Sequence, residues 1–338
     1  MIPAAFGESA PLSLGVEEEL MILDAETLEP AAAVDVLVAG AAGLDLPGMV
    51  KTELHASVVE LATGVCADVD EAVAALGELR AAAGRIARAN GFVLAAAGAH
   101  PFAALDSLPV VQEERYLRMI RQIGHAARRQ GVNGLHVHVG VGSSEECWER
   151  LEAVLAWLPV VLAVSVNSPF VDGRETGMLS NRAGILAELP RAGGPPAFGS
   201  YDAWEAWVER LVGLGVMVDY TRIWWDVRPH PQFGTLEIRI ADQPTSLDRT
   251  ALLVGMVRDL VALAAPRTTS RGEYAQNRWA AAHLGLAAEL IHPDGDRMAS
   301  ARELAHDLLG TAPPEPEAHA QLRAGASAAA DLVARTLA

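Results

Sequence analysis

Polar and apolar residues alternate along several short stretches of the chain, most clearly in residues 235–242. Three aliphatic side chains alternate there with Glu237, Arg239 and Ala241. Side chains of a β-strand point to opposite faces in turn, so this period of two is typical of a strand that is half buried. The pattern therefore predicts a strand that presents a carboxylate beside a guanidinium on its polar face.

Five further stretches are predicted as strands, namely residues 13–23, 49–63, 92–97, 133–142 and 223–231. In the first of them the alternation puts Glu17 and Glu19 on one face and Glu18 on the other. In residues 49–63 the spacing of Glu53 and Glu60 is odd, so an unbroken strand would place these carboxylates on opposite faces. A break or bulge between two short strands would bring them together.

Helices are predicted where the apolar residues recur every three or four positions. Residues 68–90 start with the capping box Asp68 and Glu71 and end at Asn90–Gly91. The other expected helices are residues 112–130, 144–163 with an interruption at Pro159, 202–214 with Asp202 as the cap, 247–264, 278–284 and 315–338. Strands and helices alternate irregularly, and we find no internal repeat or evident linker.

Four of the predicted strands contain carboxylates, imidazoles or arginines, so we expect one sheet whose polar face collects these groups from distant segments. Adjacent carboxylates such as Glu17 and Glu19 repel each other unless a cation lies between them. His136 and His138 alternate on one face of residues 133–142 and could serve metal or phosphate chemistry. The alternatives are a solvated edge strand for the glutamates and a purely structural role for the histidines.

Two further groups of residues are candidates for phosphate binding. The loop 172–182 contains glycines, hydroxyl groups and Arg182, a composition that suits phosphate oxygens but also an ordinary surface loop. A turn at Phe233–Gly234 would place Asp226 and Arg228 opposite Glu237 and Arg239 on an antiparallel neighbour. Alternatively, these four charged residues could form salt bridges between the two strands and have only a structural role.

Composition narrows the class of protein. The 338 residues are 51% hydrophobic and 20% charged, which indicates a large globular core. The formal net charge of −17 argues against nucleic-acid binding through a general basic surface. Two cysteines exclude a disulfide framework, and residues 1–11 lack the pattern of a secretory leader. We therefore expect a cytoplasmic protein with no membrane span.

Taken together and in order, these motifs resemble the bacterial carboxylate–amine ligases of the glutamate–cysteine ligase 2 family. The resemblance is carried by Gly15–Glu19, Glu53–His55, Val59–Gly64, Gly134–Gly140, Asn167–Phe170, Trp225–Pro231, Gly234–Arg239 and Gln276–Trp279. It covers about residues 12–290 and leaves a C-terminal helical segment of residues 291–338. It implies one ligase domain over residues 1–338, of the α+β class. The implied fold is a curved, mostly antiparallel sheet with helices packed on its outer face, similar to the catalytic domains of glutamine synthetase and guanidino kinases.

The resemblance also implies a chemistry and a set of site residues. ATP would phosphorylate a carboxylate, most simply the γ-carboxylate of L-glutamate, and cysteine or another amine would attack the acyl phosphate. The implied ligands of Mg²⁺ or Mn²⁺ are Glu17, Glu19, Glu53, Glu60, His136 and Glu237, with His138 behind them. Arg239 and Glu237 are the expected catalytic residues, with Arg239, Arg228, Arg182 and Arg278 as contacts for ATP or for a substrate carboxylate. Oxygen-rich ligands suit Mg²⁺ or Mn²⁺ better than Zn²⁺.

Two other functions remain compatible with these motifs. A phosphotransferase of the guanidino-kinase type would make a stable phosphorylated product and need no amine. A catalytically silent relative would bind the nucleotide or metabolite only, although the retained charged residues argue against it. The expected partners are a small carboxylate and an amine, and members of such families often form homo-oligomers.

Overall fold

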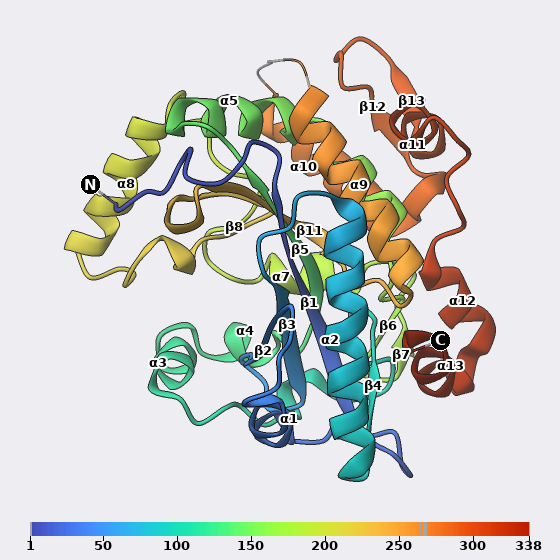
Figure 1. Cartoon of the computed structure of the whole chain (residues 1–338). Coiled ribbons are helices and arrows are strands. Elements are labelled where there is room, and N and C mark those ends of the chain that lie inside the picture. The colour runs from blue at the N-terminus through green and yellow to red at the C-terminus, as the bar shows by residue number, and fades with distance from the viewer. Residues whose placement is uncertain (1, 264, 266–268, 338) are drawn as a thin grey trace.

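A seven-stranded antiparallel sheet forms the centre of the molecule (Figure 1). The computed structural model describes residues 2–263, 265 and 269–337. In spatial order the sheet contains β10 (Val227–His230), β11 (Thr235–Asp242), β5 (Gly134–Gly140), β1 (Leu14–Asp24), β3 (Val58–Thr63) and β2 (Gly48–Thr52), with β4 (Phe92–Ala95) also paired to β1. Every pair in this sheet is antiparallel, which confirms the α+β class and the mostly antiparallel sheet.

Helices surround the sheet on both sides. They are α1 (Val34–Ala41), α2 (Val69–Ala89), α3 (Glu114–Ile123), α4 (His125–Arg128), α5 (Ser144–Leu155), α6 (Leu158–Ser165), α7 (Asn181–Leu186), α8 (Tyr201–Gly213), α9 (Leu247–Leu263), α10 (Arg271–Leu284), α11 (Ala301–Leu309), α12 (Glu317–Ala324) and α13 (Ala328–Thr336). The short strands are β6 (Phe170–Val171), β7 (Arg174–Glu175), β8 (Ala192–Gly193), β9 (Trp224–Trp225), β12 (Glu289–Ile291) and β13 (Met298–Ser300). Figure 1 shows α2 in front of the sheet, α9–α13 toward the right, and α3, α4 and α8 toward the left.

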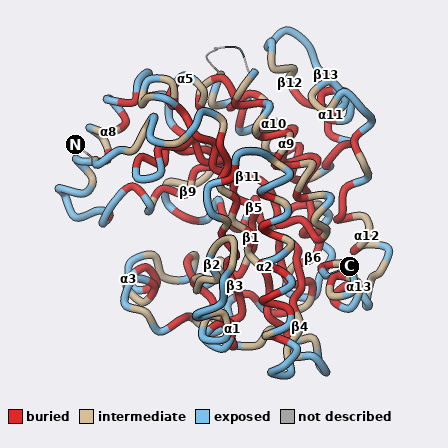
Figure 2. The backbone as a smooth tube through the Cα atoms, in the orientation of Figure 1, coloured by how far each residue is buried: buried red, intermediate tan, exposed pale blue. Residues whose placement is uncertain are grey.

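The two faces of β1 explain how the sheet is oriented. Val16, Glu18 and Leu20 are buried, whereas Glu17 and Glu19 are only partly buried, as the alternation predicted. Glu18 forms a fully buried ion pair with Arg80 of α2, at 2.7 Å, so this face packs on the helices. Figure 2 shows that buried residues follow the central strands and the inner helices. The other face is left for polar chemistry.

The expected break in residues 49–63 is present and divides them into β2 and β3. The helix at 68–90 is confirmed as α2, whose N-cap Asp68 accepts a hydrogen bond from the Glu71 amide. Residues 144–163 form two helices, because Pro159 occupies the first turn of α6.

Four helix predictions need correction. The helix expected over residues 315–338 is divided into α12 and α13, because Gly325 between them has φ +53°. Residues 112–130 form α3 and α4, because Gly124 between them has φ +75°, which ends the first helix. Helix α8 is capped by Ser200 instead of Asp202. Helix α10 begins seven residues before Arg278, at Arg271. The expected end residues Ala264 and Ala338 lie outside the described residues.

Among the described residues, no helix is both long and apolar enough to cross a membrane.

Candidate active site

Charged side chains from five strands meet on the polar face of the sheet. The strand register aligns Glu237 of β11 with His138 of β5, and Glu17 of β1 with His136 of β5. A second row aligns Glu19 of β1 with Glu60 of β3 and Lys51 of β2. Because neighbouring strands lie about 4.8 Å apart, these rows bring carboxylates, imidazoles and cations into one compact cluster.

Glu237 is held between two arginines. Its carboxylate accepts a hydrogen bond of 2.6 Å from Arg228 Nε and also forms an ion pair with Arg239. Burial alone would raise the pKa of Glu237, but the two guanidinium groups hold it well below the usual value. Glu237 is therefore ionised, and the predicted pairing of Arg228 with Glu237 across the two strands is present.

His138 has the geometry of a candidate metal ligand. Its Nδ1 lies 2.9 Å from Thr235 Oγ1, which fixes the ring. Its Nε2 is buried, has no hydrogen-bond partner in the described part of the chain, and lies 3.9 Å from Glu17 Oε2. Potential ligand atoms of Glu17, His138 and Glu237 all lie within 4.8 Å of one another. An imidazole fixed through one nitrogen and open at the other is typical of metal-binding histidines.

His136 lies on the same face but has different surroundings. Its Nδ1 is 3.3 Å from Glu17 Oε2 and also 3.3 Å from Arg239 Nη1. Burial and the charge of Arg239 lower the pKa of His136 to about 3, so the ring is neutral. A guanidinium group already occupies the space next to this imidazole.

A second group of carboxylates consists of Glu19, Glu53 and Glu60. Burial raises the pKa of Glu19 to about 7, that of Glu53 to about 7 and that of Glu60 to about 8. The charges of Glu17 and Glu53 add to the effect at Glu60, and the charge of Glu19 adds to it at Glu53. Buried carboxylates that repel one another are a suitable site for a divalent cation.

The break between β2 and β3 resolves the spacing of Glu53 and Glu60. Residues 53–57 leave the strand, and Glu53 turns so that its carboxylate accepts the Leu54 amide at 2.7 Å. Glu53 and Glu60 then both line one cavity of about 640 Å³, together with Glu17, Glu19, His136 and Arg239. Arg182 and Arg228 also line this cavity, so eight of the predicted site residues converge on one space.

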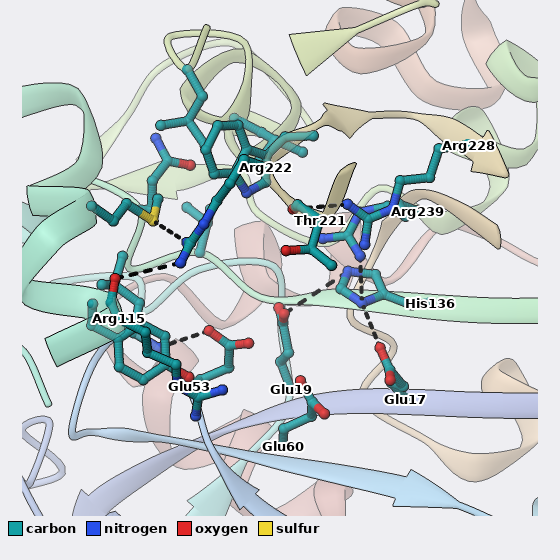
Figure 3. A pocket seen from close by; sticks show the side chains of 18 of the residues that line it. Glu17, Glu19, Glu53, Glu60, Arg115, His136, Thr221, Arg222, Arg228 and Arg239 are labelled. Atoms are coloured by element: carbon teal, nitrogen blue, oxygen red, sulfur yellow. Dashed lines mark hydrogen bonds and ion pairs between the residues drawn. The ribbon is translucent and has the colours of Figure 1, made fainter. Parts of the chain in front are cut away.

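Figure 3 shows this first cavity, with the glutamates on its sheet side, Arg222 across from them and Arg115 to one side, next to Glu53. Arg115 and Tyr116 come from α3, and Trp224 comes from β9. Arg222 reaches across to the Arg115 carbonyl at 3.4 Å and to the Met119 sulfur at 3.6 Å. This part of the cavity therefore combines apolar side chains with Arg222, while the Arg115 guanidinium group is paired with Glu113.

A second cavity of about 350 Å³ adjoins the other end of the cluster. Its walls include Lys51, Val65, His138 and Phe233, and the ring of Phe233 is half exposed. Glu17 lines both cavities. Among the described residues, every candidate metal ligand except Glu237 lines at least one of these two cavities, and Glu237 lies behind them.

The other two predicted arginines, Arg182 and Arg278, lie in different surroundings. Arg182 is buried, donates to the carbonyls of Arg239 and Ile240, and lines the first cavity. Arg278 forms an ion pair of 2.6 Å with buried Asp226 and, within the described residues, lines neither cavity. This position gives Arg278 a structural partner and does not support a direct contact with phosphate. From the loop 172–182, only Arg182 lines the first cavity, as far as the described residues show.

Several residues of the site were not predicted from the sequence. Lys51, Arg115, Arg222 and Phe233 were not assigned a role, and His138 was placed behind the ligands. A signal for Lys51 exists, because it is the only lysine in the sequence. Arg115 and Arg222 come from a helix and a turn outside the sheet, which strand alternation cannot align with the site.

Comparisons with known proteins identify the family of this chain. The sequence model of the family described as glutamate–cysteine ligase family 2 (GCS2) matches residues 13–336 of the chain. The chain belongs to this family. Relatives of this GCS2 chain include a Rubrobacter xylanophilus protein named "Putative glutamate–cysteine ligase 2-3", 40% identical over 309 residues (90% of this chain and 84% of the relative). A Herpetosiphon aurantiacus protein named "Putative glutamate–cysteine ligase 2" is 36% identical over 314 residues, 88% of this chain and 81% of its own.

Solved structures support the same fold. The glutamate–cysteine ligase of Francisella tularensis, solved in complex with AMP, matches with a TM-score of 0.62 at 16% identity, over 97% of this chain and 82% of that chain. A bifunctional glutathione synthetase from Pasteurella multocida gives the same TM-score of 0.62 at 15% identity, over 97% of this chain and 49% of that one. Membership of GCS2 confirms the expected enzyme class, an ATP-dependent ligase that forms a carbon–nitrogen bond.

Proposed function

We propose that this GCS2 ligase activates the γ-carboxylate of L-glutamate with ATP and joins it to the nitrogen of cysteine or another amine. A carboxylate oxygen takes the γ-phosphoryl group and ADP leaves. The amine nitrogen then attacks the acyl carbon, phosphate leaves, and the nitrogen loses a proton as the amide forms. The observation that carries this proposal is the position of the charged cluster between two cavities that share Glu17.

The two cavities suit different substrates. The second cavity has apolar walls and a half-exposed Phe233 ring on which an adenine base could stack. The first cavity contains the glutamates and also Arg222, whose guanidinium group contacts the Arg115 carbonyl and the Met119 sulfur. Arg222 therefore suits a substrate carboxylate that must be placed near the phosphates. Phosphoryl transfer depends mainly on positioning and charge neutralisation, so a cluster of this kind between the two substrates is what the reaction requires.

The donor set fits divalent cations. Glu17, His138 and Glu237 would hold one ion, and Glu19, Glu53 and Glu60 would hold another, with His136 beside both groups. Bound Mg²⁺ or Mn²⁺ would neutralise charge on the phosphate oxygens. Arg239, which lines the first cavity, would donate to the oxygens of the transferred phosphoryl group. Glu237, which is itself held by Arg228, keeps the guanidinium group of Arg239 in place. Three expectations from the sequence stay predictions, namely a cytoplasmic location, a homo-oligomer and a single ligase domain.

The test is turnover of Mg-ATP with L-glutamate labelled with ¹⁸O in the γ-carboxylate, against a panel of amines that includes cysteine. We expect amine-dependent ADP release, an amide product, and one ¹⁸O atom in the released phosphate, since the carboxylate oxygen leaves with the phosphoryl group. The Arg239→Lys variant, for which turnover should be strongly reduced, is the control. A phosphorylated product formed without an amine would instead indicate a phosphotransferase. No turnover with any pair would indicate another carboxylate or a silent protein.

A further inference from the structure

Lys51 is the only lysine of the chain. The sequence contains 26 basic Lys and Arg residues, and the other positions of this kind are all arginine. An ammonium group is a compact point charge on a flexible stem, whereas a guanidinium group is a planar fork. The one position that carries an ammonium group lies at the candidate active site.

The sheet register places Lys51 in the carboxylate cluster. Lys51 of β2 pairs with Glu60 of β3, which pairs with Glu19 of β1. The ammonium nitrogen lies 2.7 Å from Glu60 Oε1 and 3.6 Å from Glu17 Oε1. Lys51 therefore contacts one carboxylate from each of the two groups of candidate metal ligands.

Lys51 is also reachable from the second cavity. It lines that cavity together with Glu17 and Phe233, and 34% of its side chain is exposed, compared with 10% for Glu60. The strand that carries Lys51, β2, lies at the edge of the sheet. The ammonium group thus lies between the carboxylates and the space that we assign to the nucleotide.

We propose that Lys51 is a positioning residue that binds the terminal phosphates of the nucleotide in the second cavity. Before substrates bind, the same ammonium group holds Glu60 and Glu17 together. When cations occupy the carboxylates, it is free to contact phosphate oxygens at the boundary of the two cavities. This inference rests on the proposed function, because it requires ATP in the second cavity.

A unique lysine allows a direct test on the unmodified sequence. The protein is treated with an amine-acetylating reagent in the presence of Mg²⁺ alone, or of Mg²⁺ with saturating ATP, ADP or AMP. Mass spectrometry of the peptide that contains Lys51 gives the rate of its acetylation. We expect ATP and ADP to slow this rate by about tenfold, the effect of one charge-assisted contact, and AMP to slow it far less. Equal rates in all four samples, or equal protection by AMP and ATP, would overturn the proposal.

Variants provide the second readout. Lys51→Met should weaken binding of a fluorescent ATP analogue and raise the KM for ATP by about tenfold or more, with a smaller change in KM for glutamate. Lys51→Arg keeps the charge and should fall between Lys51→Met and wild type. Arg302→Gln removes one positive charge on the exposed surface of α11 and serves as the matched control.

The outcomes separate this inference from the proposed function. If ATP binds wild type and Lys51→Met equally well, Lys51 has only a structural role and the ligase proposal is unaffected. If wild type binds no ATP at all, both proposals fail. Thermal unfolding of each variant shows whether a loss of binding reflects a loss of folding.

Discussion

His136 and His138 show how two residues of one motif acquire different chemistry. They point to the same face of β5, yet Nδ1 of His136 lies 3.3 Å from Arg239, whereas Nε2 of His138 lacks a partner among the described residues and faces Glu17. A divalent cation is repelled by a guanidinium group and attracted by a free imidazole nitrogen beside carboxylates. Nε2 of His136 also faces a carboxylate, at 3.9 Å from Glu19 Oε1, so both histidines stay candidate ligands, and we propose His138 as the stronger one.

The two histidines can be compared directly. Loss of partners behind a ligand commonly reduces metal affinity 10- to 100-fold, so loss of the ligand itself should cost at least about tenfold. We expect His138→Asn to weaken Mn²⁺ binding by at least that factor, measured by calorimetry, and His136→Asn to weaken it less. A larger loss in His136→Asn would move the cation toward Glu17 and Glu19.

Arg228 and Arg239 both form ion pairs with Glu237, but they differ in their other hydrogen-bond partners. Arg228 also donates to the carbonyls of Thr221 and Ile223. Arg239 lines the first cavity, and its Nε has no partner in the part of the chain that the structure describes. Arg228 is thus engaged within the protein, while Arg239 has capacity left for a substrate.

Replacement of each by lysine should separate stability from activity. Arg239→Lys loses the fork that faces the phosphoryl group, and we expect kcat to fall by about 10²-fold or more with a small change in Tm. Arg228→Lys leaves carbonyls unpaired, at about 1–3 kcal/mol for each group, and should lower Tm more than Arg239→Lys does. Near-normal turnover of Arg239→Lys would exclude it from the phosphoryl site.

At the scale of elements, Gly234 sets the geometry with which β11 begins. It follows the 3₁₀ turn Pro231–Phe233 and has φ +64°, and a Cβ there would lie 2.2 Å from the Ala5 carbonyl oxygen. The backbone conformation alone costs a non-glycine residue about 1–2 kcal/mol, and the clash with backbone adds to this cost. The turn thus fixes where Glu237 and Arg239 lie.

We therefore expect Gly234→Ala to lower the free energy of unfolding by more than about 2 kcal/mol and to reduce turnover. Gly184→Ala in α7 is the matched control, because nothing lies within 4 Å of its added Cβ. That variant should be neutral or slightly stabilised. Urea unfolding of both variants provides the comparison, and equal stability would show that the turn relaxes without cost.

Period-two alternation predicted the strands of the sheet and the faces of their side chains, but it did not predict which distant residues would be in contact. It placed Glu17 and Glu19 opposite Glu18, and it required the break that separates Glu53 from Glu60. It could not show that Arg278 would be neutralised by Asp226, because that contact joins α10 to the segment between β9 and β10. Contacts between distant segments depend on tertiary packing, which local periodicity does not encode.

At the scale of the whole molecule, the cluster links stability to pH and to metal. The carboxyl groups of Glu19, Glu53 and Glu60 have pKa values of about 7, 7 and 8, above the ordinary value of 4.5 in an unfolded chain. Between these values the folded state binds more protons than the unfolded state, so stability falls as pH rises. His136 has the opposite effect, because its pKa is lowered from 6.5 to about 3, but this contribution is complete above pH 6.5.

Between pH 6.5 and pH 8 the carboxylates therefore dominate among these groups. We expect Tm in the presence of EDTA to fall across this window, and saturating Mg²⁺ or Mn²⁺ to abolish the fall, because a bound cation favours the ionised carboxylates. The gain in Tm on adding metal should be larger at pH 8 than at pH 6.5. In the double variant Glu53→Gln/Glu60→Gln, the EDTA curve should flatten and most of the metal-dependent gain should disappear. A Tm in EDTA that stays constant or rises across the window would show that these glutamates are not held protonated by mutual repulsion. The cation would then have no unfavourable charge to relieve in this cluster.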